Sequence, residues 1–133
     1  MTASADPLAR LVVDESEVNR EFLASLLQGR VRLDPSRSTF AFQLGMRDRL
    51  SNRQLVLVAL LAQKALHLLA DKCPQGLRPQ EIEQATGVKG NTLRPILKLL
   101  LDRKIIGQND SKAYLVPVYA MEDAAQLLTE QGE

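Results

Sequence analysis

The chain has 133 residues, of which 45% are apolar and 25% charged, and its 17 Lys and Arg residues nearly balance 16 Asp and Glu residues. A chain of this length buries enough apolar surface to fold as one unit without a disulfide or a structural metal. One Cys and one His exclude a disulfide framework and the usual zinc tetrad, so we expect no metal, no cofactor and a reducing compartment.

The sequence predicts neither a secretory signal nor a membrane span. Residues 1–10 lack a basic start followed by an apolar core. The most apolar run, residues 55–69, is interrupted by Gln63, Lys64 and His67 and falls short of the roughly 20 residues that a span needs. We therefore expect a cytoplasmic, intracellular protein with no membrane contact.

Charge is distributed unevenly along the chain. Residues 1–50 contain seven basic and seven acidic residues, residues 51–118 contain ten and five, and residues 119–133 contain four acidic residues and no basic ones. The basic middle segment indicates an anion-binding face, although lysines spread over a solvated surface give the same count.

The first 50 residues predict a helix followed by a β-hairpin. Residues 1–7 are small and polar, and we expect them to be disordered. A helix should begin at Asp14, with Glu17 three residues later as in a capping box, and should end at Gly29. Its apolar stripe consists of Val18, Phe22, Leu23, Leu26 and Leu27.

Residues 30–44 change to the two-residue period of strands, and turn-forming residues stand at 34–37. This pattern predicts a hairpin. Phe40 and Phe42, like Phe22, have the spacing of core residues rather than that of a base-stacking platform. We recognise no family signature in residues 1–50.

A second capping box, Ser51 with Gln54, opens a helix that should run to about Asp71. Residues 55–62 are apolar on every side, so this helix must be covered all round. In so small a domain a second subunit is a plausible cover, and we expect a symmetric homodimer.

Residues 77–118 predict two short helices and a hairpin. Pro79 suits the first turn of the first helix, and Gly87 should reverse the chain in a left-handed conformation. The second helix should begin near Asn91 or Thr92, which would place Pro95 in its first turn. Strands are expected at residues 104–108 and 113–118, joined by a turn at 109–112.

The last segment, residues 121–128, predicts a short acidic helix. Because residues 119–133 are acidic and lie at the end of the chain, we expect this tail to be dispensable for folding.

The order helix, short turn with Gly, helix, hairpin with Lys at its tip resembles the winged helix-turn-helix superfamily over about residues 53–118. The fold class that this implies is α+β and mostly helical: a winged core at residues 51–118, an N-terminal extension at 1–50 and a C-terminal helix or tail at 119–133. In that superfamily the second helix of the motif enters the DNA major groove and the wing contacts a flanking groove or phosphate. Matched position by position, the resemblance assigns DNA contacts to Lys89, Asn91, Thr92, Arg94, Lys98 and Lys112.

The residues themselves agree with this assignment. An apolar stripe on residues 93–101 leaves Arg94 and Lys98 on or near the opposite face, where Arg can read guanine and Lys can neutralise a phosphate. The wing contains one Lys and the adjacent Asp110, which indicates modest affinity for each subunit.

The sequence contains few residues that would support other functional classes. Residues 87–90 form a lone GxxG, a weak sign of a KH domain, and no phosphate-binding P-loop is present. His67 and Cys73 have no catalytic neighbours in the sequence, so we expect no enzyme. The sequence predicts a non-enzymatic duplex-DNA-binding protein, a small transcriptional regulator or other DNA-associated factor. The alternative is a winged-helix protein-protein interaction module, or a subunit of a larger assembly, with no direct DNA binding.

Overall fold

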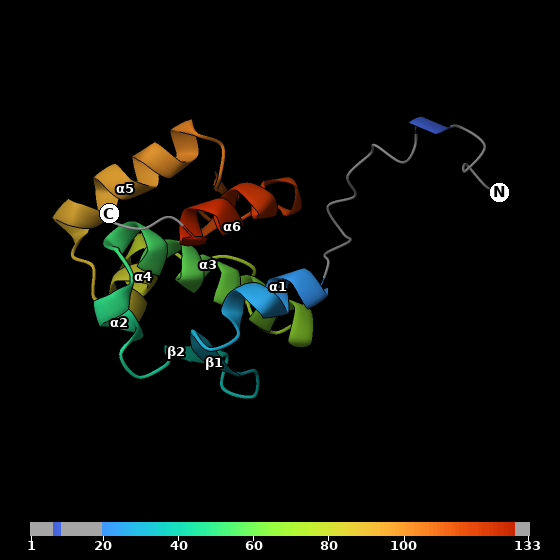
Figure 1. The fold of residues 1–133 in the computed structure, drawn as a ribbon, viewed down its shortest axis with the longest axis horizontal. Coiled ribbons are helices and arrows are strands. Elements are labelled where there is room, and N and C mark those ends of the chain that lie inside the picture. The colour runs from blue at the N-terminus through green and yellow to red at the C-terminus, as the bar shows by residue number, and fades with distance from the viewer. Residues whose placement is uncertain (1–6, 9–19, 130–133) are drawn as a thin grey trace.

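The computed structural model describes residues 7–8 and 20–129, and there the fold is α+β and mostly helical (Figure 1). The helices are α1 (Arg20–Leu27), α2 (Met46–Arg49), α3 (Asn52–Leu69), α4 (Pro79–Thr86), α5 (Gly90–Asp102), the 3-10 turn η3 (Val118–Ala120) and α6 (Met121–Thr129). Two small antiparallel sheets pair β1 (Val31–Asp34) with β2 (Thr39–Phe42) and β3 (Gly107–Gln108) with β4 (Tyr114–Leu115).

Helix α3 is the centre of the molecule. Its predicted capping box is confirmed, because Ser51 Oγ accepts from the Gln54 N–H at 3.2 Å and Gln54 Oε1 accepts from the Ser51 N–H at 3.0 Å. Every residue from Leu55 to Leu66 is buried, under α1, the β1–β2 hairpin, α4, β4 and α6 (Figure 1). The chain itself therefore covers the apolar helix, and the reason for expecting a subunit interface at residues 55–62 is removed.

The N-terminal helix and hairpin pack on one side of α3. Helix α1 ends before Gly29, which has a left-handed φ of 79°, while the predicted start at Asp14 lies outside the described residues. The predicted hairpin is confirmed, with Val31 opposite Phe42 and Asp34 opposite Thr39. Phe40 and Phe42 are half-buried and meet edge to face against the common core, as their spacing predicted.

The hairpin turn is tied to the linker between α3 and α4. Lys72 Nζ donates to the Ser36 carbonyl at 2.7 Å, and Ser38 Oγ lies 3.1 Å from Cys73 Sγ. The Cys73 carbonyl is 2.9 Å from His67 Nδ1. The single Cys and the single His thus lie in the junction that joins the N-terminal hairpin to the end of α3.

Helix α6 is part of the core. Met121, Ala124, Leu127 and Leu128 are at most 5% exposed, and Gln54 Nε2 donates to the Leu127 carbonyl at 2.9 Å. The predicted short acidic helix is confirmed. The expectation that this segment is dispensable for folding is at odds with this burial, because the apolar face of the helix completes the cover of α3.

The second hairpin is shorter than predicted. Lys104, at φ 62°, takes the left-handed position that usually holds Gly after a helix, and the Ile105 N–H bonds back to the Leu100 carbonyl. Ile105 and Ile106 are therefore buried in a helix-ending turn rather than in a strand. Leu77 adds a further bridge to the hairpin, exchanging hydrogen bonds of 2.9 and 2.7 Å with Tyr114.

None of the helices in the described part of the chain combines the length and the apolar character that a membrane crossing requires.

Candidate nucleic-acid interface

The turn between α4 and α5 is built as the sequence predicted. Gly87 ends α4 at φ 80° and ψ 0°, and its N–H bonds to the Glu83 carbonyl at 2.8 Å. The buried Thr86 hydroxyl donates to the Ile82 carbonyl at 2.7 Å and accepts from the Val88 N–H at 3.1 Å. These bonds satisfy the polar groups at the end of the helix, so the start of α5 is held in a fixed direction.

Helix α5 begins at Gly90, one or two residues before the predicted start. Pro95 consequently lies in the second turn and not in the first, which corrects the prediction. A proline there has no N–H to offer the Asn91 carbonyl. Asn91, whose carbonyl loses this partner, is an exposed residue.

One face of α5 packs on the core and the opposite face is open. Leu93, Leu97 and Leu100 are at most 4% exposed. With about 100° between successive residues, Asn91, Arg94 and Lys98 fall within one narrow sector of the helix surface. All the predicted contact residues on this helix are exposed, and Thr92 lies to the side of that sector. This open face of α5 ends at the acidic Asp102, which is also exposed.

The N-terminal end of α5 carries charges of both signs. Lys89 is the exposed N-cap residue, and its backbone carbonyl begins the helix. The Glu83 carboxylate lies close by, since a Cβ built on Gly90 would be 2.9 Å from Glu83 Oε2. A carboxylate at this end favours the helix dipole and opposes a phosphate. Phosphate contacts are therefore better placed at Lys98, one turn beyond Arg94.

The tip of the second hairpin is held by Asn109. Its Oδ1 accepts from the Ser111 N–H at 2.9 Å and from the Ala113 N–H at 3.1 Å. Lys112 follows at φ 64°, exposed at the tip. The predicted turn at residues 109–112 is confirmed, and it presents the Lys112 side chain to solvent.

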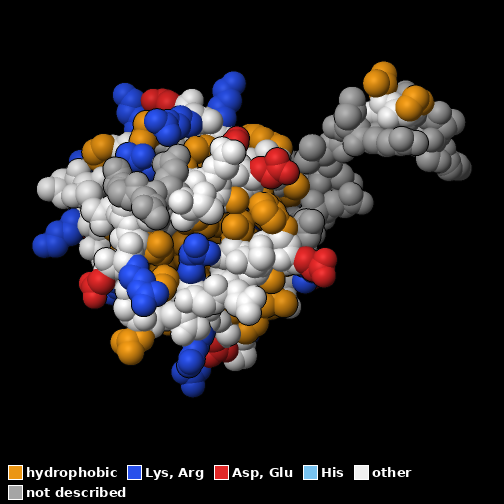
Figure 2. Space-filling view, in the orientation of Figure 1, with side chains coloured by type: hydrophobic (Ala, Val, Ile, Leu, Met, Phe, Trp, Pro, Cys, Tyr) orange, Lys and Arg blue, Asp and Glu red, His pale blue; other side chains and the backbone are white. Residues whose placement is uncertain are grey.

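The basic residues of this surface are unpaired within the described part of the chain. Arg37, by contrast, pairs with Asp34 at 3.7 Å on the other hairpin. On the face shown in Figure 2, Lys and Arg side chains gather over α5 and beside α2, as Figure 1 places these helices. Cations without acidic partners make a surface that attracts polyanions.

Sequence reasoning missed two arginines at the motif. Arg47 of α2 donates to the Ala85 carbonyl at 2.7 Å, so the N-terminal extension reaches the last turn of α4. Arg78 stands at the N-cap of α4, where its own N–H bonds to Glu81 Oε1 at 2.8 Å. The Arg78–Pro79 pair signals a helix start, but only the fold brings Arg78 near the tip of the β3–β4 hairpin.

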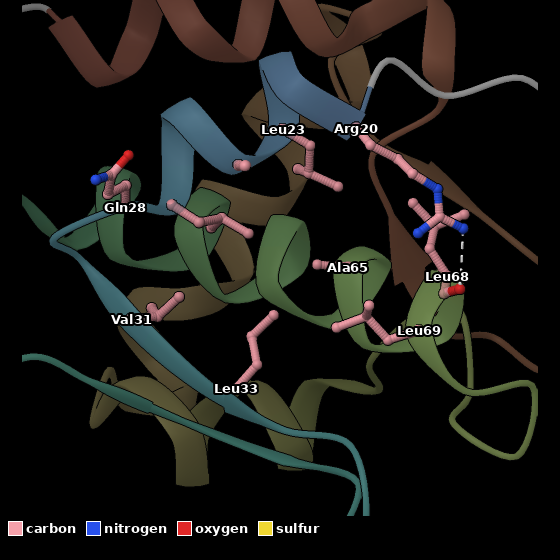
Figure 3. A pocket seen from close by; sticks show the side chains of 10 residues that line it. Arg20, Leu23, Gln28, Val31, Leu33, Ala65, Leu68 and Leu69 are labelled. Carbon is pink, nitrogen blue, oxygen red and sulfur yellow. Dashed lines mark hydrogen bonds between the residues drawn. The ribbon is translucent and has the colours of Figure 1, made fainter.

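A second surface feature lies away from this face. A groove of about 270 Å³ runs between α1, β1 and α3, and Figure 3 shows Leu23 and Leu33 directed into it. Arg20 closes one end by donating to the Leu68 carbonyl at 3.1 Å, and Leu69 at the rim is 54% exposed. The groove is apolar and open to solvent.

Among the described residues no group of three His, Cys, Asp or Glu side chains is arranged to hold a metal ion. The chain matches no family model, no curated protein and no solved structure.

Proposed function

We propose that this protein binds duplex DNA as a winged helix-turn-helix, with α5 in the major groove. The observation that carries the proposal is the open face of α5, where Arg94 and Lys98 stand one turn apart without acidic partners among the described residues. The order α3, the Leu77 bridge, α4, the Gly87 turn, α5 and the β3–β4 hairpin supports the winged arrangement.

The roles of the side chains follow from their chemistry. Arg94 has the planar fork that pairs with guanine in the major groove, and Asn91 can pair with adenine. Lys89, Lys98 and Lys112 are point charges that neutralise phosphates and contribute little sequence information. Thr92, beside the reading face, contacts the sugar-phosphate backbone. A transcriptional regulator or another DNA-associated factor uses such a surface.

The test is binding of the full chain to random duplex DNA at several salt concentrations. Three phosphates neutralised by one chain give a slope of log affinity against log salt of about −3. Affinity that falls with salt at about this slope supports the proposal. Absence of salt-sensitive binding to any duplex overturns it.

A homodimer fits this function, because a second copy doubles the phosphates contacted by a chain that contains few basic residues on its reading face. Its interface is not at residues 55–62, which the chain buries itself. We place it instead at the groove between α1, β1 and α3. Exposed Leu69 at the rim of that groove is an apolar side chain that a second copy would cover.

The second candidate function is a winged-helix module that binds protein. The same apolar groove is the observation that favours it, since grooves of this kind accept apolar side chains of a partner. In this alternative the basic face meets an acidic protein. Failure of duplex binding together with a chain that remains monomeric would favour this candidate.

A further inference from the structure

A hollow lies between the N-terminal end of α4 and the tip of the β3–β4 hairpin. Its volume is about 550 Å³, and it opens to solvent. Arg78, Pro79 and Gln80 line one wall, and Ser111 and Lys112 line the other. Two basic side chains that are 34 positions apart in the sequence thus border the same space.

The backbone fixes the distance between the two walls. Leu77, next to Arg78, exchanges two hydrogen bonds with Tyr114, two residues after Lys112. The approach is close, because a Cβ built on Gly76 would lie 2.6 Å from the Tyr114 carbonyl oxygen. The arrangement of Arg78 and Lys112 is therefore a property of the fold and not of two independent flexible loops.

Two cations border the hollow, and cations are the side chains that a phosphate diester attracts. Arg78 and Lys112 are both exposed and form no ion pair with a described residue. Two cations beside one hollow repel each other, and an anion between them removes that repulsion. The guanidinium donates in a fixed fork, and the ammonium acts as a point charge. The Ser111 hydroxyl and the Gln80 amide supply further donors.

The nearby acidic residues do not neutralise the two cations. The Glu81 carboxylate is engaged through Oε1 with the Arg78 backbone N–H, and Asp110 does not line the hollow. The guanidinium of Arg78 and the ammonium of Lys112 therefore remain available to a ligand. This offsets the apparent weakness of a wing that contains one Lys.

We propose that Arg78 and Lys112 together bind one backbone phosphate of the duplex, which makes Arg78 a DNA-contacting residue. This inference rests on the proposed function. It adds a contact from α4 to those of α5 and the wing, and it fixes the register of α5 in the groove because phosphate contacts set orientation rather than sequence.

The test is a double-mutant cycle on duplex binding with the full chain. Arg78→Ala and Lys112→Ala should each weaken binding several-fold and lower the salt slope by up to about 0.9, the value for one phosphate. If both side chains bind the same phosphate, the double variant should also lower the slope by about 0.9 in total, and its loss should be smaller than the product of the single losses.

Three comparisons make the cycle specific. Arg78→Ala combined with Lys98→Ala should give multiplied losses, since Lys98 is assigned a different phosphate from the one that Arg78 and Lys112 share. Arg78→Lys should retain most of the binding. Arg32→Ala, on the exposed side of β1, should change nothing. Because Arg78→Ala keeps the backbone N–H that binds Glu81, its melting curve should match that of the wild type.

The outcomes separate the two proposals. If the wild type binds duplex DNA but Arg78→Ala binds equally well, or if the losses of Arg78→Ala and Lys112→Ala multiply, the shared phosphate is wrong and the DNA-binding proposal stands. If the wild type binds no duplex, the proposed function falls and this inference falls with it.

Discussion

At the scale of single residues, Arg94 and Lys98 are neighbours on one helix face and are assigned different roles. Arg94→Ala should cost about 1–3 kcal/mol on the preferred duplex, because it removes a base contact, and less on random DNA. Lys98→Ala should weaken binding to both alike and reduce the salt slope by about one. Binding titrations against a duplex selected from a random library and against unselected duplexes measure both effects.

Arg37→Ala is the matched control, because Arg37 pairs with Asp34 on the first hairpin, away from α5. It should leave both titrations unchanged. Equal losses on selected and random duplexes for Arg94→Ala would show that Arg94 contacts only phosphate.

Gly87 is the residue on which the direction of α5 depends. A Cβ at this position would meet Arg47 Nη1 at an ordinary 3.8 Å, so space is not the constraint. The constraint is the φ of 80°, which β-branched residues avoid, and Gly87→Val should lower the free energy of unfolding by about 1–3 kcal/mol. Thermal or urea unfolding checks this value.

The control for Gly87→Val is Gly90→Ala. Its new Cβ would approach only the flexible end of Glu83, and Ala is a better helix former than Gly, so stability should hold or rise. An unchanged melting curve for Gly87→Val would contradict the account of the turn.

At the scale of elements, the acidic charge of α6 suggests that the helix is dispensable for folding, whereas its buried apolar face indicates that folding requires it. Truncation after Tyr119 removes the buried Met121, Leu127 and Leu128, each contributing about 1.5–3 kcal/mol through burial. It also leaves Gln54 Nε2 without its carbonyl acceptors in α6. We expect the truncated chain to unfold or to lose several kcal/mol of stability, as circular dichroism melting will show.

A variant that neutralises the acidic residues of α6 separates the effect of their charge from the effect of apolar packing. Glu122→Gln with Asp123→Asn keeps the apolar face of α6, and both residues are exposed, so this variant should melt close to the wild type. A truncated chain that melts like the wild type would show that α6 is not needed for folding.

The elements differ in how well the sequence predicts them. The side chains of Ser51 and Gln54 cap the start of α3, and the missing side chain of Gly87 permits the turn after α4. Both features depend on local residues, so the sequence predicts both correctly. The extent of the second hairpin was not, because Lys104 takes a left-handed position that usually marks Gly, and Ile105 looks like a strand residue. The approach of Arg78 to Lys112 depends on the long-range Leu77–Tyr114 bridge, which has no local signal.

Sequence composition also gave a wrong expectation of what buries the apolar helix α3. Residues 55–62 are apolar on every side, and composition alone does not say whether the cover comes from the same chain or from another. Here α1, the β1–β2 hairpin, α4, β4 and α6 of the same chain supply it. An apolar surface that the fold leaves open is the groove between α1, β1 and α3.

At the scale of the whole molecule, the interface that we propose for a homodimer is the groove between α1, β1 and α3. If a second copy covers it, sedimentation at micromolar concentration should give twice the 14.8 kDa of one chain. Leu69→Glu should then return the monomer, because burying a carboxylate in an apolar interface is costly, while Leu69 is 54% exposed in the single chain and its replacement leaves the fold intact. A dimer that survives Leu69→Glu would place the interface elsewhere, and a wild type of 14.8 kDa alone would exclude the pair. If the dimer binds DNA as proposed, two chains contact twice as many phosphates, so loss of the dimer should also reduce the salt slope of duplex binding by about half.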